Sequence, residues 1–134
     1  MIKQLLFIHP LGQAFAFLFG VINIVTGFAS KKVNLALHIN CGALYYIIAL
    51  MGTGMGVVAV KVARHNDVAL SMGLHNVNAM VMIVFFAVGA TTGAMMAMNK
   101  QKIASLKKYH GLANLISLVL FVCQFFSGIM VIMK

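Results

Sequence analysis

Four long apolar runs divide this chain, and they constrain its fold more than any other feature of the sequence. They cover roughly residues 5–29, 35–60, 68–98 and 103–133, and each is long enough for the about 20 helical residues that cross a bilayer. The breaks between them are short and carry most of the charges. Since short connections make consecutive helices antiparallel neighbours, we expect one all-α domain over residues 1–134, an integral membrane up-down-up-down four-helix bundle.

The composition agrees with a lipid bilayer as the solvent. Hydrophobic residues make up 63% of the chain and charged residues only 8%, whereas a soluble domain is about one quarter charged. The net charge of +9 does not indicate nucleic-acid binding, because the basic residues sit in short segments between apolar runs. The two cysteines lie inside apolar runs without a CxxC partner, so neither a disulfide framework nor a zinc knuckle is expected.

The basic residues also predict an orientation. The side of the membrane that holds the N-terminus, here named side A, carries four of them, and the opposite side, side B, carries six. Cytoplasmic loops of membrane proteins have an excess of Lys and Arg. We therefore expect the lysine-rich segments 30–34 and 99–108 of side B to face the cytoplasm, in a bacterial inner membrane.

Four of the five histidines stand near the start of one run each: His9, His38, His75 and His110. Because successive helices reverse direction, His9 and His75 lie near side A, and His38 and His110 lie near side B. Helices one and three are diagonal in such a bundle, as are helices two and four, so each pair faces across the centre. Two facing imidazoles can fill both axial positions of a haem iron, and ionisable residues inside a membrane are functional by default. The pattern predicts two haem sites at two depths.

A glycine follows each of these histidines at one fixed distance. The residues 18 positions further along are Gly27, Gly56, Gly93 and Gly128. Eighteen residues are five helical turns and rise about 27 Å, so each glycine shares its histidine's face and lies at the other side of the membrane. A flat macrocycle could approach the backbone there. Small residues at this spacing also suit plain helix packing in membranes, and both interpretations stay open at this point.

Basic residues near the two depths could neutralise haem propionates. They are Lys61 and Arg64 for the side A haem, and Lys31, Lys32, Lys107 and Lys108 for the side B haem. Ordinary topology signals account for the same residues equally well. Gln13, Asn78 and Asn114 lie about one turn from the histidines, where they would either tune the haems or bond helix to helix.

The fifth histidine, His65, falls in the charged second loop. It is an alternative to His9 as a ligand. His9 precedes Pro10, a residue suited to the first turn of a helix, so we expect His9 at the very end of its helix.

The four helices with their four histidines and four glycines resemble the cytochrome b561 superfamily, including its ferric-reductase-like and small bacterial members. The resemblance covers nearly the whole chain and implies two b-type haems, one at each side of the bundle, that carry electrons across the membrane. It implies an electron-transfer protein with quinol- or ferric-reductase-type oxidoreductase activity, supplied by a small reductant, a quinol or a partner protein. Many relatives have six helices or an attached donor domain, and no residues here match the ascorbate site of animal and plant members. A quinol or another cytochrome is therefore the favoured donor, so that a quinone or a redox partner protein is the expected partner.

Two haem-free alternatives are also compatible with four spans. A small multidrug transporter typically couples protons through a membrane carboxylate, but the single acid, Asp67, falls in a loop. A copper or other metal transporter would use His and Met, although the matched histidine depths fit two separate sites better than one continuous path. A homodimer is compatible with any of these functions.

Overall fold

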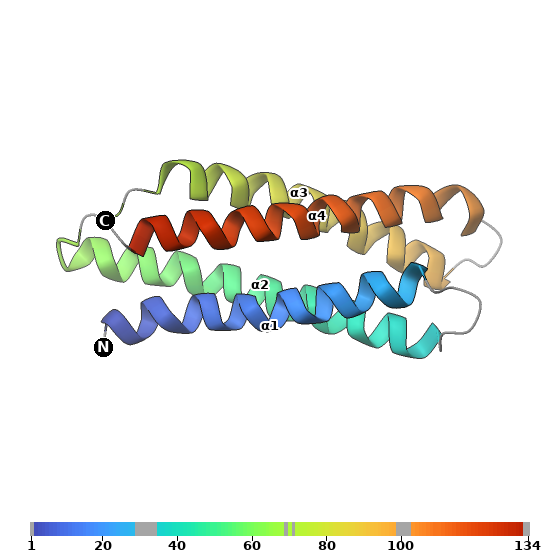
Figure 1. Ribbon diagram of the computed structural model, residues 1–134, viewed down its shortest axis with the longest axis horizontal. Helices are drawn as coiled ribbons and strands as arrows, with labels where there is room; N and C mark the ends of the chain where they lie inside the picture. The colour runs from blue at the N-terminus through green and yellow to red at the C-terminus, as the bar shows by residue number, and fades with distance from the viewer. Residues whose placement is uncertain (1, 29–34, 69, 71, 99–102, 133–134) are drawn as a thin grey trace.

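The four predicted helices are all present. The computed structural model describes residues 2–28, 35–68, 70, 72–98 and 103–132. The helices are α1 (Ile2–Phe28), α2 (Leu35–His65), α3 (Gly73–Met98) and α4 (Ile103–Ile132). They run up and down in chain order, so that α1 begins and α4 ends at the same end of the molecule (Figure 1). The predicted all-α, up-down-up-down four-helix bundle is confirmed.

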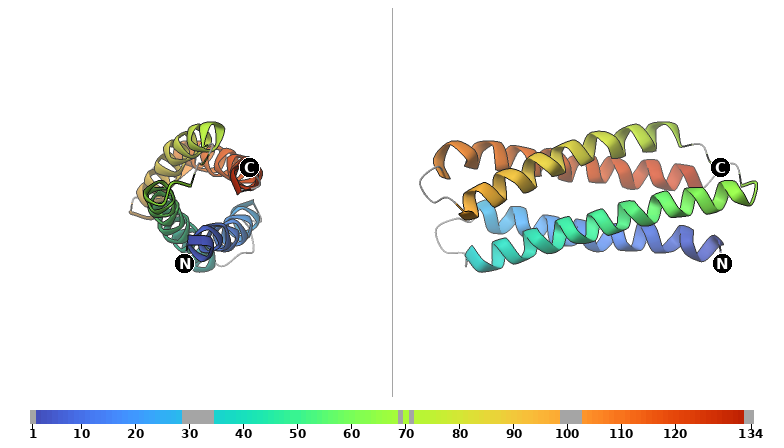
Figure 2. Two further views of the ribbon diagram at one scale, coloured as in Figure 1. Left: turned by 90° about the vertical axis from the view of Figure 1, so that its left-hand side faces the viewer. Right: turned by 180° about the vertical axis from the view of Figure 1, so that it is seen from behind.

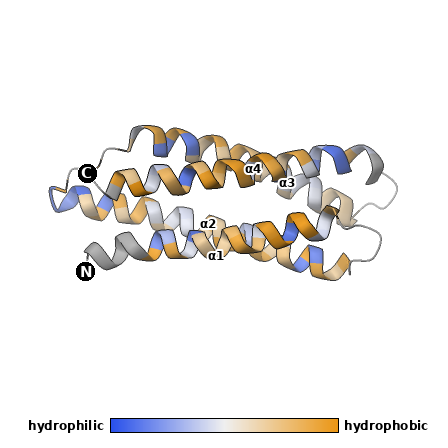
Figure 3. Cartoon of the chain, viewed as in Figure 1, coloured by the Kyte–Doolittle hydropathy of each residue, from blue (hydrophilic) through white to orange (hydrophobic). Residues whose placement is uncertain are grey.

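All four helices are long and apolar enough to cross a membrane. Large hydrophobic side chains cover the outside of the bundle; Leu18, Val84 and Phe126 are each more than half exposed. Hydrophilic residues gather mostly toward the two ends, with apolar residues between them (Figure 3). The hydrocarbon interior of a bilayer contains no water, so these apolar faces are suited to contact with lipid tails.

The first helix begins earlier than expected. It starts at Ile2 and carries Pro10 in its interior, so the prediction that His9 lies at the very end of its helix is wrong. Proline is tolerated inside membrane helices because neighbouring groups re-satisfy the backbone. The signal taken from Pro10 is one of soluble helix starts, which explains the error.

The second helix ends later than expected, at His65. Its end is a Schellman-type cap, in which the Val68 N–H donates to the Ala63 carbonyl at 3.0 Å across Asp67, whose φ is 55°. Asp is among the few residues other than glycine that adopt this left-handed conformation. His65 is consequently the exposed last residue of a helix and not a loop residue. The third helix correspondingly begins at Gly73, later than the predicted 68.

Large and small residues alternate across the α1–α2 interface. The facing positions are 9, 13, 16, 20, 23 and 27 in α1, and 38, 42, 45, 49, 52 and 56 in α2. Each glycine lies against a larger residue of the other helix: Gly56 against His9, Gly52 against Gln13, Gly20 against Tyr45, Gly42 against Asn23, and Gly27 against His38. Spacings that alternate between four and three residues are a heptad repeat, the pattern of left-handed helix pairs.

The α3–α4 hairpin repeats this arrangement. Residues of α1 recur 66 positions later in α3, and residues of α2 recur 72 positions later in α4. The recurring residues are His9, Thr26 and Gly27 as His75, Thr92 and Gly93, and His38 and Gly56 as His110 and Gly128. Helices pack most closely within each hairpin, and the end-on view shows the four in a ring with α1 opposite α3 (Figure 2). The repeat therefore places equivalent histidines on diagonal helices.

An apolar core separates the two ends of the bundle. It consists of Ala16, Tyr45, Ala49, Met82, Phe86 and Phe121. The ring of Phe86 lies 5.1 Å from that of Tyr45 and 6.4 Å from that of Phe121, centroid to centroid. Met82 is 1% exposed within this core. The histidines of side A and side B thus occupy separate regions.

Candidate functional site

The four span histidines form two diagonal pairs. His9 of α1 and His75 of α3 have ring centroids 6.3 Å apart, with their planes at 82°. His38 of α2 and His110 of α4 have centroids 6.2 Å apart, with their planes at 81°. These are the two pairs expected from the sequence, one at each end of the bundle, and their geometry is nearly identical.

The spacing of each pair matches two imidazoles bound to opposite faces of one metal ion. A metal–imidazole bond is about 2.0 Å, and a ring centre lies about 1.1 Å from its nitrogen, so such rings have centroids about 6.2 Å apart. Both observed separations, 6.3 and 6.2 Å, equal this value closely. Each pair therefore has the ring-to-ring spacing that one ion bound between two imidazoles would require.

Backbone carbonyls determine the tautomer of three of these rings, that is, which ring nitrogen carries the proton. The Nδ1 atom lies 2.7 Å from the Gly52 carbonyl in His9, 3.1 Å from the Asn23 carbonyl in His38 and 3.0 Å from the Gly89 carbonyl in His110. A carbonyl can only accept, so a neutral ring must carry its proton on Nδ1 and its lone pair on Nε2. Metal-bound histidines commonly have this arrangement, in which Nδ1–H donates to a backbone carbonyl and Nε2 is the ligand atom.

His75 reaches the same state through side chains. Asn78 Nδ2 donates to the Leu120 carbonyl at 2.9 Å and to Gln124 Oε1 at 2.8 Å, so the amide nitrogen of Gln124 is the atom that lies 2.9 Å from His75 Nε2. That nitrogen donates to the His75 lone pair. The proton of His75 then resides on Nδ1 and is donated to Ser127 Oγ at 3.1 Å. All four rings therefore share one tautomer.

Two threonines support the side B rings in the same way. Thr26 Oγ1 lies 3.2 Å from His38 Nδ1, and Thr92 Oγ1 lies 3.3 Å from His110 Nδ1. Each threonine stands one residue before a site glycine, and the two are equivalent in the internal repeat. Sequence reasoning missed both, as well as Ser127 and the role of Gln124. The recurrence of Thr-Gly 66 residues later is the signal that could have found the threonines.

The four glycines lie at the predicted depths, but their immediate contact is a histidine of the neighbouring helix. A Cβ added to Gly56 would lie 2.9 Å from His9 Cε1, and one added to Gly93 would lie 3.0 Å from His110 Cε1. Gly27 and Gly128 are placed in the same way against the other two histidines. None of the glycines has a positive φ. Their role here is therefore not an unusual backbone conformation but the absence of a side chain, which leaves space for the imidazole ring.

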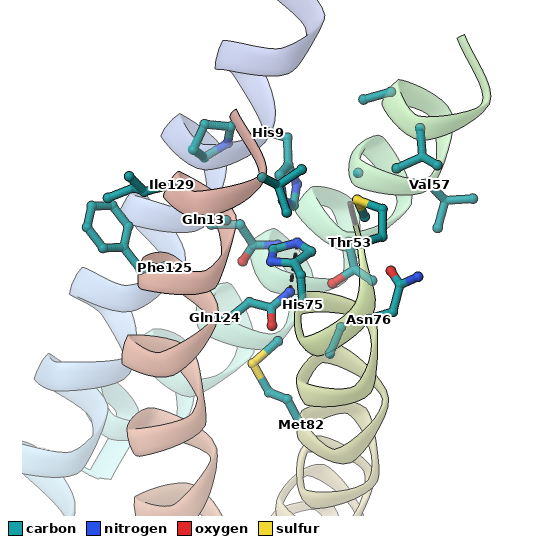
Figure 4. A pocket seen from close by; sticks show the side chains of 18 of the residues that line it. His9, Gln13, Thr53, Val57, His75, Asn76, Met82, Gln124, Phe125 and Ile129 are labelled. Atoms are coloured by element: carbon teal, nitrogen blue, oxygen red, sulfur yellow. Dashed lines mark hydrogen bonds between the residues drawn. The ribbon is translucent and has the colours of Figure 1, made fainter. Parts of the chain in front are cut away.

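A cavity of about 600 Å³ opens beside the side A pair, well within the about 300–1,000 Å³ of cofactor pockets. Figure 4 shows His9, His75, Gln13 and Gln124 converging on it, with Phe125 and Ile129 among its apolar lining. Lys61 and Arg64 of α2 also line it. The cavity thus combines two imidazoles, an apolar wall and two cations near the membrane surface.

Comparison with known family models, curated proteins and solved structures finds no match to this chain. What the site can hold follows from its own donor set. Among the described residues, no three His, Cys, Asp or Glu side chains gather around one point, and each pair offers two imidazoles. A macrocycle that brings its own four nitrogens needs only two axial ligands, and the paired imidazoles and the apolar cavity fit such a group.

The remaining predicted residues line the side A cavity, are exposed on a helix, or lie outside the described residues. Lys61 and Arg64 line the side A cavity, as described above. Lys107 and Lys108 are exposed on α4, one turn before His110, and Lys31 and Lys32 lie outside the described residues. His65 is exposed at the end of α2, and it is His9 that stands opposite His75.

Proposed function

We propose that this chain is a dihaem b-type membrane cytochrome that carries electrons across a bilayer. The observation that carries the proposal is the duplicated histidine pair: two diagonal pairs, each about 6.3 Å between centroids, each with its lone pairs on Nε2. His9 and His75 would hold the side A haem, and His38 and His110 the side B haem. The likeness of the four-helix, four-histidine pattern to the cytochrome b561 superfamily supports the same function.

A bound haem would supply a one-electron Fe(III)/Fe(II) couple at each depth. The chain's own residues would orient the ligands, neutralise the propionates and keep water out of the bundle centre. The Nδ1 hydrogen bonds fix the orientation of each imidazole and raise its basicity. Lys61 and Arg64 would neutralise propionates at the mouth of the side A cavity, and Lys107 and Lys108 would do so at side B. The apolar core around Phe86 excludes water between the two depths.

The proposal extends to partners and location. A quinol, a small reductant or another cytochrome would deliver electrons at one side, and an acceptor would take them at the other. The lysine-rich side B would face the cytoplasm of a bacterial cell, with the bundle in the inner membrane. A homodimer is compatible with this arrangement, because both histidine pairs form within one chain.

Haem content of the detergent-purified protein and of single histidine variants tests the proposal. We expect about two haems per wild-type chain, both six-coordinate and low-spin in the oxidised-minus-reduced spectrum. His75→Ala should lose the side A haem alone, and His110→Ala the side B haem alone. His65→Ala is the matched control and should keep both. Absence of haem in wild-type protein from haem-replete cells, or retention of both haems in each variant, would overturn the assignment.

A further inference from the structure

The internal repeat makes the four histidines directly comparable, and one of them differs from the rest. In the other three rings Nδ1 bonds to a backbone carbonyl, and a threonine hydroxyl also contacts Nδ1 of His38 and of His110. At His75, the Nε2 lone pair itself accepts a hydrogen bond, from the Gln124 amide at 2.9 Å. That lone pair is the electron pair that a metal ion would need.

The equivalent positions carry no such contact. Gln124 corresponds to Gly52 in the first hairpin, 72 residues earlier. Gly52 has no side chain to donate to the His9 lone pair, and its carbonyl accepts from Nδ1 instead. At side B, Asn114 Nδ2 is 3.4 Å from His110 Nε2, but it donates to the His110 backbone carbonyl at 2.8 Å. Among the residues that the structure describes, the Gln124 contact is therefore the one that is both short and directed at a ligand lone pair.

Gln124 is also held firmly in place. Its oxygen accepts from Asn78, its nitrogen donates to His75, and its side chain is only 7% exposed. Asn78 is anchored in turn on the Leu120 carbonyl of the same helix as Gln124. The amide thus occupies a defined place at the rim of the side A cavity, on the atom that a ligand must take.

We propose that Gln124, anchored by Asn78, is a latch on His75. An iron ion can bind Nε2 of His75 only after the Gln124 amide has released it, so the latch weakens and slows the capture of haem at side A. This inference rests on the proposed haem function and concerns the regulation of that same site. The Gln124 amide satisfies the His75 lone pair, which would otherwise be a partly buried nitrogen without a partner.

The size of the effect follows from the bond that is lost. Releasing the latch costs one buried neutral hydrogen bond and leaves the amide to find a new partner, which corresponds to about a five-fold loss of affinity. Removing the amide should therefore tighten haem binding at side A. A merely structural role, as a link between α3 and α4, predicts the opposite sign, because the variant would lose packing and would bind haem more weakly.

Haem titration of full-length protein separates these outcomes. A His110→Ala background leaves only the side A pair, so the titration reports one site. In that background, Gln124→Leu should bind haem about five-fold more tightly and load faster. Gln13→Leu is the matched control, because Gln13 is an equally buried amide in the same cavity whose hydrogen bond goes to the Ala49 carbonyl; it should not tighten binding. Gln124→Met serves as a second variant if Gln124→Leu fails to fold.

The latch is refuted if both Gln124 variants fold and bind haem no more tightly than the parent. Asn78→Ala gives an independent check, because loss of the anchor should also tighten binding. Failure of the proposed function looks different: neither the parent nor any variant would take up haem, and the wild type would not either. That result would overturn the latch together with the function.

Discussion

Gly56→Ala tests the packing logic of the site most sharply. The added Cβ would lie 2.9 Å from His9 Cε1 and 3.0 Å from His9 Nδ1, closer than carbon atoms normally approach. The ring cannot simply retreat, because its Nδ1 is bonded to the Gly52 carbonyl at 2.7 Å and His75 faces it across the bundle. The imidazole must shift by a few tenths of an ångström, or the helices must separate.

The magnitude follows from two opposing terms. Overpacking of a close-packed interior costs about 1–3 kcal/mol, and replacing a helical glycine by alanine returns up to about 1 kcal/mol of helix propensity. We expect a net loss of about 1–2 kcal/mol, which is roughly a factor of 5–30 in an equilibrium constant. The loss should appear both in the stability of the bundle and in haem affinity at side A.

Thermal unfolding and haem titration in detergent would measure both effects. Gly54→Ala is the matched control, because it lies on the same helix and an added Cβ there meets nothing within 4 Å. It should be neutral or slightly stabilising. If Gly56→Ala behaves like Gly54→Ala in both assays, then the glycine is not making room for His9, and the reasoning about all four glycines fails.

Two further predictions concern the surroundings of the pairs. Tyr46→Phe removes the hydroxyl that donates to Asn114 Oδ1 at 2.7 Å. Because this leaves a buried side-chain carbonyl unpaired, the free energy of unfolding should fall by about 1–3 kcal/mol. The control Tyr109→Phe, at an exposed tyrosine, should leave the melting temperature unchanged. The double substitution Lys61→Gln with Arg64→Gln should weaken haem binding at side A and remove its dependence on ionic strength, measured by titration at low and high salt, and unaltered affinity would show that these cations do not hold the propionates.

The sequence predicts the fold and the histidine pairing because both follow from helical periodicity and chain direction. Apolar length defines four helices, alternation of direction sorts the histidines by depth, and the diagonal arrangement pairs His9 with His75. The 18-residue offset places Gly56 at the depth of His9. These are properties of single helices and of their order, which need no knowledge of neighbouring side chains.

The features that sequence reasoning missed or predicted wrongly depend on contacts between helices or on local context. The contact of Gly56 with His9 requires the register of the α1–α2 interface, which depends on the sizes of many facing residues. The hydrogen bond from Gln124 to His75 requires the register of α3 against α4. The start of α1 was predicted wrongly, because the preference of proline for the first turn of a helix comes from soluble proteins. His65 was predicted to lie in a loop, but the cap at Asp67 extends α2 through the charged segment.

Electron transfer through sealed vesicles tests the central claim most directly. The haem-loaded protein would be placed in liposomes that contain a trapped oxidant, and a reductant that cannot cross the membrane would be added outside. We predict rapid reduction of the trapped oxidant by wild-type protein, and loss of that reaction in both His75→Ala and His110→Ala, because each variant removes one of the two centres. Undiminished reduction in either variant, or none in fully loaded wild-type protein, would contradict a conduit that uses both histidine pairs.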